Sequence, residues 1–114
     1  MHLNLAALAV AATSLLASAN ALSPQDVPAD LPVSKLLTSA QSHLSRGETT
    51  EALIYYDAAI ARDPTNYLTL FKRATTYLSL GRTSQATDDF NKVLSLKPGF
   101  EGAHLQLARL RAKA

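Results

Sequence analysis

The sequence predicts an all-α fold built from stacked helix pairs, and three observations lead to this prediction. From Val33 onward the chain repeats itself with a period of 34 residues, the length of one helix–turn–helix unit. Small residues, glycines and prolines recur at fixed places within each period. Of the 114 residues, 47% are hydrophobic and 18% are charged, a composition that excludes a disordered chain. The chain contains no cysteine, which excludes a disulfide scaffold. A chain of this length holds one small domain.

Residues 1–21 are expected to form a signal peptide. They contain no Asp, Glu, Lys or Arg, and their apolar run from Leu3 to Leu16 is shorter than the ~20 residues that a transmembrane helix needs. Ala19-Asn20-Ala21 matches the A-x-A pattern of a cleavage site, so we expect cleavage after Ala21, with cleavage after Ala19 as the alternative. The mature chain is therefore expected to be lumenal or secreted, with no membrane contact once the signal is removed.

Residues 22–32 are expected to form a proline-rich linker. Pro24, Pro28 and Pro32 recur at every fourth residue, a spacing that prevents a helix and favours an extended, polyproline-like spacer. Pro32 can also occupy the first turn of the helix that follows, where its missing N–H costs nothing.

A shift of the chain by 34 residues against itself displays the repeat directly. Identical residues then fall opposite one another: Leu36 and Leu70, Ala40 and Ala74, Gly47 and Gly81, Ala52 and Ala86, and Pro64 and Pro98. This period with these residue types is typical of the tetratricopeptide repeat (TPR), a pair of antiparallel helices called A and B. We predict a TPR solenoid of two full repeats plus one A helix, with TPR 1 at 33–66, TPR 2 at 67–100 and a partial TPR 3 or capping helix at 101–114. The expected helices are 33–46, 50–62, 67–80, 84–96 and 101–112.

The repeated residues have physical roles in such helix pairs. Alanine lets helices A and B approach closely, and Ala40, Ala74 and Ala108 hold this position on the A helices. Gly47 and Gly81 follow the A helices, where a left-handed backbone is expected. Hydroxyl side chains are expected to cap the B helices, and the candidates are Thr49 or Thr50 and Thr83 or Ser84.

The TPR pattern implies a concave groove lined by the A helices, in which partners bind. The residues predicted to line it are Leu37, Gln41, Leu44, Leu68, Phe71, Thr75, Leu78 and Leu105. They form an apolar strip edged by hydroxyl and amide groups, which suits apolar segments and lacks the Lys and Asn with which other TPR proteins clamp a carboxylate. The alternative is that neighbouring repeats bury these side chains. We expect such burial most for Leu44 and Leu78 and least for Leu37, Leu68 and Phe71.

No catalytic, metal-binding or cofactor-binding residue is predicted, so an enzyme is not expected. The chain has no glycine-rich phosphate loop, G-x-S-x-G or H-E-x-x-H motif. His43 is expected to pack, because the next repeat has an aromatic residue at the same position, and His104 with Glu101 gives only a pair on one helix face. Asp88 and Asp89 are expected on a solvated face. A net charge of +2 gives no indication of nucleic-acid binding.

Three stretches point to a narrower family. They are Asp63-Pro64-Thr65-Asn66-Tyr67, Arg73-Ala74-Thr75 and Phe100 through Gln106. With the signal peptide, they make residues 33–114 resemble the TPR and J-domain co-chaperones of the endoplasmic reticulum lumen. This resemblance implies a location in that lumen, with secretion as the second choice, and N-terminal repeats that hold unfolded or misfolded polypeptides. It also implies a J domain that passes these clients to a lumenal Hsp70.

The chain departs from that family in one respect. It contains no His-Pro-Asp tripeptide and has no room for a J domain, so Hsp70 is an expected partner only through residues not present here. Only the client-holding role is carried over, onto the groove residues. Two other hypotheses stand beside it: a scaffold or adaptor TPR that docks one folded partner, and a truncated gene product.

Overall fold

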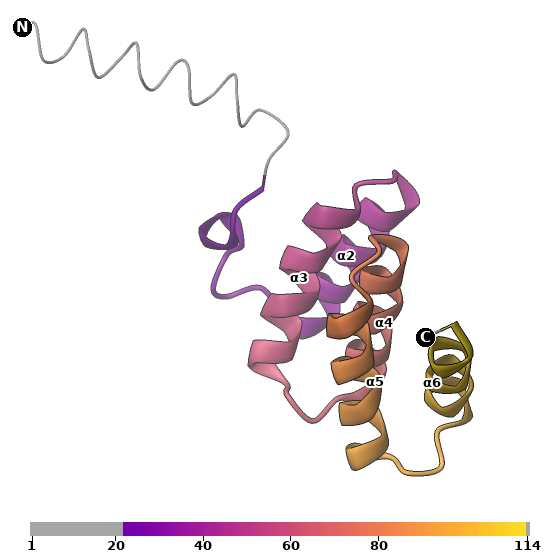
Figure 1. The fold of residues 1–114 in the computed structure, drawn as a ribbon. Coiled ribbons are helices and arrows are strands. Elements are labelled where there is room, and N and C mark those ends of the chain that lie inside the picture. Colours follow the sequence, from indigo (N-terminus) through magenta and orange to yellow (C-terminus); the bar gives the residue numbers. More distant parts are fainter. Residues whose placement is uncertain (1–21, 114) are drawn as a thin grey trace, which may run out of the picture.

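The computed structural model describes residues 22–113. The expected signal peptide and its cleavage site lie outside these residues. The described part contains a short 3₁₀ turn and five α-helices and no strand, which confirms the all-α prediction (Figure 1). The elements are η1 (Pro24–Asp26), α2 (Val33–Ser45), α3 (Thr49–Arg62), α4 (Tyr67–Ser79), α5 (Thr83–Leu96) and α6 (Glu101–Lys113).

The helices form two successive hairpins and a final single helix. Helix α2 packs along α3 and helix α4 along α5, and these are the two most extensive helix contacts. Helix α3 then packs on α4, and α5 packs on α6, so each pair stacks on the next (Figure 1). This is the order of A and B helices that the 34-residue period predicts. None of the five helices has the length and hydropathy that crossing a membrane requires.

Glycine shapes both turns within the hairpins. Gly47 and Gly81 have φ values of +75° and +74°, the left-handed region that other residues enter only at a cost. The N–H of Gly47 donates to the carbonyl of Leu44 at 2.9 Å, and the N–H of Glu48 donates to the carbonyl of His43 at 2.8 Å. These two bonds satisfy the last carbonyls of α2 in a Schellman motif, and α4 ends in the same way.

The predicted hydroxyl caps of the B helices are wrong. Helices α3 and α5 begin at Thr49 and Thr83, so the residues at the capping positions are Glu48 and Arg82, and neither makes a side-chain capping bond. The Schellman motif explains the shift, because it uses the residue after the glycine as its last hydrogen-bonded position and the next helix begins at once. A side-chain cap is present on α4, where the Asn66 side chain accepts from the N–H of Leu68 at 3.1 Å.

Small residues at the helix contacts are buried as the repeat predicts. Ala40, Ala52, Ala74 and Ala86 have no exposed surface, and the large side chains beside them fill the remaining space. The fully or nearly fully buried large side chains are Leu36, Tyr56, Leu70, Phe90 and Val93. Ala108 is the exception: it is exposed, because no described helix packs on that face of α6.

The linker is more ordered than an extended spacer. Residues Pro24–Asp26 form the 3₁₀ turn, which is closed by the carboxylate of Asp26 accepting from the backbone N–H and the hydroxyl of Ser23, each at 2.9 Å. The guanidinium of Arg62, at the end of α3, donates to the carbonyls of Ala29 and Leu31. The linker is therefore fastened to the first hairpin, with Pro32 immediately before α2.

Candidate functional site

A cavity of about 470 Å³ lies along the A helices, where the groove is predicted. Leu37, Thr38, Gln41, Ser42 and Ser45 of α2 line it, together with Lys72 of α4. Its lining thus joins helices from two repeats, which is possible because the hairpins stack side by side. Leu37 and Gln41 are predicted groove residues, whereas Lys72 is a lining residue that the sequence analysis missed.

Two further predicted residues are the most exposed large hydrophobic side chains of the described part. Leu68 on α4 is 47% exposed and Leu105 on α6 is 52% exposed. Both hold groove positions of their A helices, whereas the third large exposed side chain, Leu96, is the last residue of a B helix. Exposed leucine is common on proteins, but Leu68 and Leu105 both lie at positions that are predicted to line the groove, which makes this surface the candidate contact site.

Leu44, Leu78 and Thr75 contribute less to the open surface. Leu44 and Leu78 are half-buried and pack against the buried clusters, in the manner expected for late positions of the A helices. The hydroxyl of Thr75 donates to the carbonyl of Lys72 at 2.8 Å and is thereby turned toward its own helix. Leu37 also packs partly on the buried cluster of Ala40, so only part of its side chain faces the groove.

The expectation that Phe71 is among the least covered groove residues is wrong, because its ring packs against the buried core. Its ring makes edge contacts with the rings of Phe90, at 5.5 Å between centroids, and Phe100, at 5.0 Å. Gly102 at the start of α6 makes room for it, since a Cβ atom there would lie 3.0 Å from Cζ of Phe71. Phe71 therefore joins α4 to α5 and α6 and belongs to the packing between repeats more than to an open groove.

The pair Asp88 and Asp89 is not a uniformly solvated face. Asp88 is exposed, but Asp89 is buried and its two carboxylate oxygens accept from Nε and Nη2 of Arg73, both at 2.8 Å. Nη1 of Arg73 also donates to Asp57 of the preceding repeat at 3.0 Å. The hydrogen bonds from Arg73 to Asp89 raise the pKa of the guanidinium further above its usual value. This cluster links α3, α4 and α5 and was not anticipated from the sequence.

The histidines make local contacts. Nδ1 of His43 lies 2.7 Å from Oε1 of Glu48, and its ring stacks on Tyr55 at 5.3 Å. The hydrogen bonds to His43 and Arg46 lower the pKa of Glu48 below its usual value. Nε2 of His104 donates to the carbonyl of Pro98 at 2.7 Å, and not to Glu101. Residues 22–113 contain no cluster of three His, Asp or Glu side chains that could hold a metal ion.

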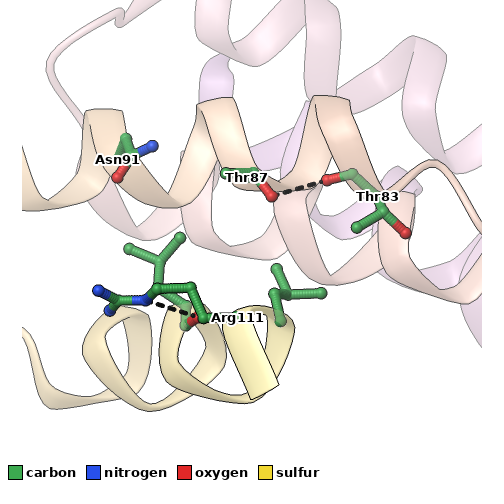
Figure 2. Close-up of a pocket in the computed structure, with 6 residues that line it drawn as sticks. Thr83, Thr87, Asn91 and Arg111 are labelled. Carbon is green, nitrogen blue, oxygen red and sulfur yellow. Dashed lines mark hydrogen bonds between the residues drawn. The ribbon is translucent and has the colours of Figure 1, made fainter. Parts of the chain in front are cut away.

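A second cavity, of about 410 Å³, lies between α5 and α6. Figure 2 shows Thr83, Thr87 and Asn91 along its α5 side and Arg111 on its α6 side; Leu107 and Leu110 complete the lining. The hydroxyl of Thr87 donates to the carbonyl of Thr83 at 2.9 Å, so it is satisfied within its own helix.

The repeat period explains this second cavity. Thr87, Leu107 and Arg111 of the lining correspond, one period of 34 residues earlier, to Leu53, Arg73 and Tyr77. Helix α5 packs on these three earlier side chains. Leu53 and Tyr77 share a buried cluster with Phe90 of α5, and Arg73 holds Asp89 of the same helix. The cavity between α5 and α6 therefore corresponds to the place that α5 itself occupies one period earlier.

Comparison with known proteins establishes the class. The family model described as "Tetratricopeptide repeat" matches residues 55–88. The structure is similar to the crystal structure of the P58(IPK) TPR domain, with a TM-score of 0.63 and 38% identity, over 65% of this chain and 21% of that chain. The described helices are thus those of a tetratricopeptide repeat protein.

Sequence relatives narrow the class to one family. The chain is 88% identical over all 114 residues to the tetratricopeptide repeat and J domain-containing co-chaperone DNJ1 of Fusarium oxysporum f. sp. lycopersici, of which it covers 22%. It is 43% identical over 79 residues to DNJ1 of Cryptococcus neoformans var. grubii, and 37% identical over 81 residues to human DnaJ homolog subfamily C member 3. These two matches cover 69% and 71% of the chain, and 15% and 16% of the relatives. The chain belongs to the family of TPR and J domain-containing co-chaperones and spans about a fifth of the length of these relatives.

Proposed function

We propose that this chain is a non-catalytic polypeptide-binding module of an Hsp70 co-chaperone in the lumen of the endoplasmic reticulum. In this proposal, it holds apolar segments of unfolded or misfolded proteins on the surface of α2, α4 and α6. The observation that carries the proposal is the exposure of two leucines at groove positions of the A helices, Leu68 at 47% and Leu105 at 52%, together with the cavity that Leu37 lines.

The chemistry of this surface suits an extended chain of varied sequence. Its leucines offer apolar contact without a deep, shaped pocket that would select one side chain. Gln41 and the hydroxyls of Thr38, Ser42 and Ser45 lie beside Leu37 and can exchange hydrogen bonds with a peptide backbone. Two relatives are named as co-chaperones that contain both a tetratricopeptide repeat and a J domain, and this supports a role in which the bound polypeptide passes to an Hsp70. This chain has no His-Pro-Asp tripeptide, so that step would require residues outside it.

An aggregation assay tests the holding role. The purified 114-residue chain is added to a chemically denatured model protein, and light scattering follows aggregation. We expect suppression by the parent chain and loss of most of that suppression in the double variant Leu68→Asp plus Leu105→Asp. Both side chains are about half exposed, so the charges should leave the fold intact; circular dichroism and the thermal midpoint check this.

A matched variant separates the groove from a general effect of charge. Leu96→Asp plus Ala61→Asp adds the same two carboxylates to exposed positions on the B helices. This control should suppress aggregation as well as the parent does. Equal suppression by the groove variant and the parent would refute the holding role.

The second candidate function is a scaffold that docks one folded partner, and the cavity between α5 and α6 favours it. Leu107 and Leu110 offer an apolar surface there that fits a helix with the pattern of α5. A pulldown that yields one stoichiometric partner, lost on Leu110→Asp and indifferent to unfolded competitor proteins, would support this function over the first.

A further inference from the structure

Charge is divided unequally between the two kinds of helix. The A helices α2, α4 and α6 carry six basic side chains and one acidic side chain, whereas the B helices α3 and α5 carry two basic and four acidic ones. The basic residues on the A helices are Lys35, Lys72, Arg73, Arg109, Arg111 and Lys113. The net charge of +2 conceals this division, because the two helix classes partly cancel.

Two of these cations lie on the groove face itself. Lys72 lines the cavity that contains Leu37 and follows Leu68 by four residues. Arg109 follows Leu105 by four residues in the same way. Residues four apart lie on the same face of a helix, so each of the two exposed leucines has a cation one turn further along.

Neither cation is neutralised by the described part of the chain. The ion pairs within residues 22–113 join His43 and Arg46 to Glu48, and Arg73 to Asp57 and Asp89. Lys72 and Arg109 are exposed and take no part in them. Glu101, in the first turn of α6, is the single acidic side chain on the three A helices and lies two turns before Arg109. The groove face therefore presents apolar surface together with uncompensated positive charge.

We propose that the groove selects apolar polypeptide segments flanked by Asp or Glu over those flanked by Lys or Arg. This inference rests on the proposed polypeptide-holding function and specifies its client class. Leucine side chains supply contact area to the apolar centre of the client, and Lys72 and Arg109 attract carboxylates on either side of it. Charge of this kind sets partner choice and association rate more than it adds affinity, and salt screens it.

Fluorescence anisotropy with three labelled peptides tests the proposal. The peptides share one apolar centre and carry flanks of Asp, Ser or Lys, and each is titrated with the 114-residue chain. We expect the Asp-flanked peptide to bind roughly three- to tenfold more tightly than the Ser-flanked one at low salt, and the Lys-flanked one more weakly. The difference should shrink at ~1 M salt, where the Debye length falls to about 3 Å.

Two charge variants locate the effect. Lys72→Gln plus Arg109→Gln should bring the affinities for the three peptides together, because both positive charges of the groove face are removed. Arg82→Gln plus Lys92→Gln removes the same charge from exposed positions off the A helices and should preserve the preference. All variants carry the same residues 1–21, so differences between them report on the substituted positions.

The possible results separate the two proposals. Binding of all three peptides with equal affinity would overturn the charge preference and leave the holding function standing. An equal loss of preference in both charge variants would also overturn it, because net charge and not the groove would then be responsible. Failure of every peptide to bind, the Ser-flanked one included, would overturn the holding function and the preference with it.

Discussion

Removing the guanidinium of Arg73 should destabilise the protein more than any surface change, and Arg73→Met is the variant that shows it. Both oxygens of Asp89 accept from Arg73 at 2.8 Å, and the Asp89 side chain is only 7% exposed. Residues 22–113 contain no buried side-chain polar atom without a hydrogen-bond partner. The substitution would leave one buried carboxylate with no donor.

The magnitude follows from burial. Breaking a buried ion pair by deleting one partner costs about 3–5 kcal/mol. Because the Arg73 side chain is 21% exposed and water can partly reach the site, we expect about 3 kcal/mol at neutral pH, a factor of roughly 150 in the unfolding equilibrium. Replacing both partners, as Arg73→Met plus Asp89→Leu, should change the free energy of unfolding by less than about 1 kcal/mol, because apolar pairs of similar volume substitute well for buried ions.

Urea unfolding of the parent, both single variants and the double variant gives the coupling between the two residues. Asp57→Asn is the control, because Asp57 is 56% exposed and its pair with Arg73 should contribute less than about 1 kcal/mol. The reasoning is refuted if Arg73→Met costs under about 1 kcal/mol, or if the double variant is as unstable as the sum of the single ones.

Two further predictions concern the turns. Gly81→Ala should lower the free energy of unfolding by about 1–2 kcal/mol, because its backbone is left-handed at φ +74°, whereas Gly99→Ala, with open space and no positive φ, should not lower it; equal changes in the two thermal midpoints would contradict this. Hydrogen bonds to His43 and Arg46 lower the pKa of Glu48, so its stabilisation is complete above its ordinary pKa of 4.5 and is lost as the pH falls through the lower folded value. Glu48→Gln should therefore flatten the loss of thermal stability below about pH 5, and an unchanged acid slope would argue against the contact.

The repeat made most of the fold predictable. Ala40, Ala74 and the two turn glycines recur because the same helix contact and the same left-handed turn recur, so their burial and backbone angles follow from spacing alone. The five helices therefore begin and end within one residue of the expected bounds. The hydroxyl caps failed because a hydroxyl before a helix indicates a cap only when the preceding turn leaves it room, and here the Schellman turns do not.

Side chains that pair across helices were not predictable in the same way. Asp88 and Asp89 are adjacent, but Asp89 lies three residues after Ala86 and four before Val93, on the apolar face of α5, and this spacing was the available signal for its burial. Its environment comes from Arg73, sixteen residues earlier on α4, and only the packing of α4 against α5 brings the two together. The neighbouring repeat gives no hint of this pair, since the residue one period before Arg73 is Ser39.

The same dependence on neighbours decides how open the groove is. Leu68 and Phe71 lie three residues apart on one face of α4, yet Leu68 is half exposed and the Phe71 ring is held by Phe90 and Phe100. The position in the repeat predicts the face, but the exposure depends on the turn between α5 and α6, which brings Phe100 back onto α4. Gly102 completes this arrangement, because a Cβ atom there would lie 3.0 Å from Cζ of Phe71 and the ring would have to shift. The position of the Phe71 ring therefore depends on Phe90, Phe100 and Gly102, none of which belongs to α4, and for this reason the pattern of α4 alone did not predict how far Phe71 is covered.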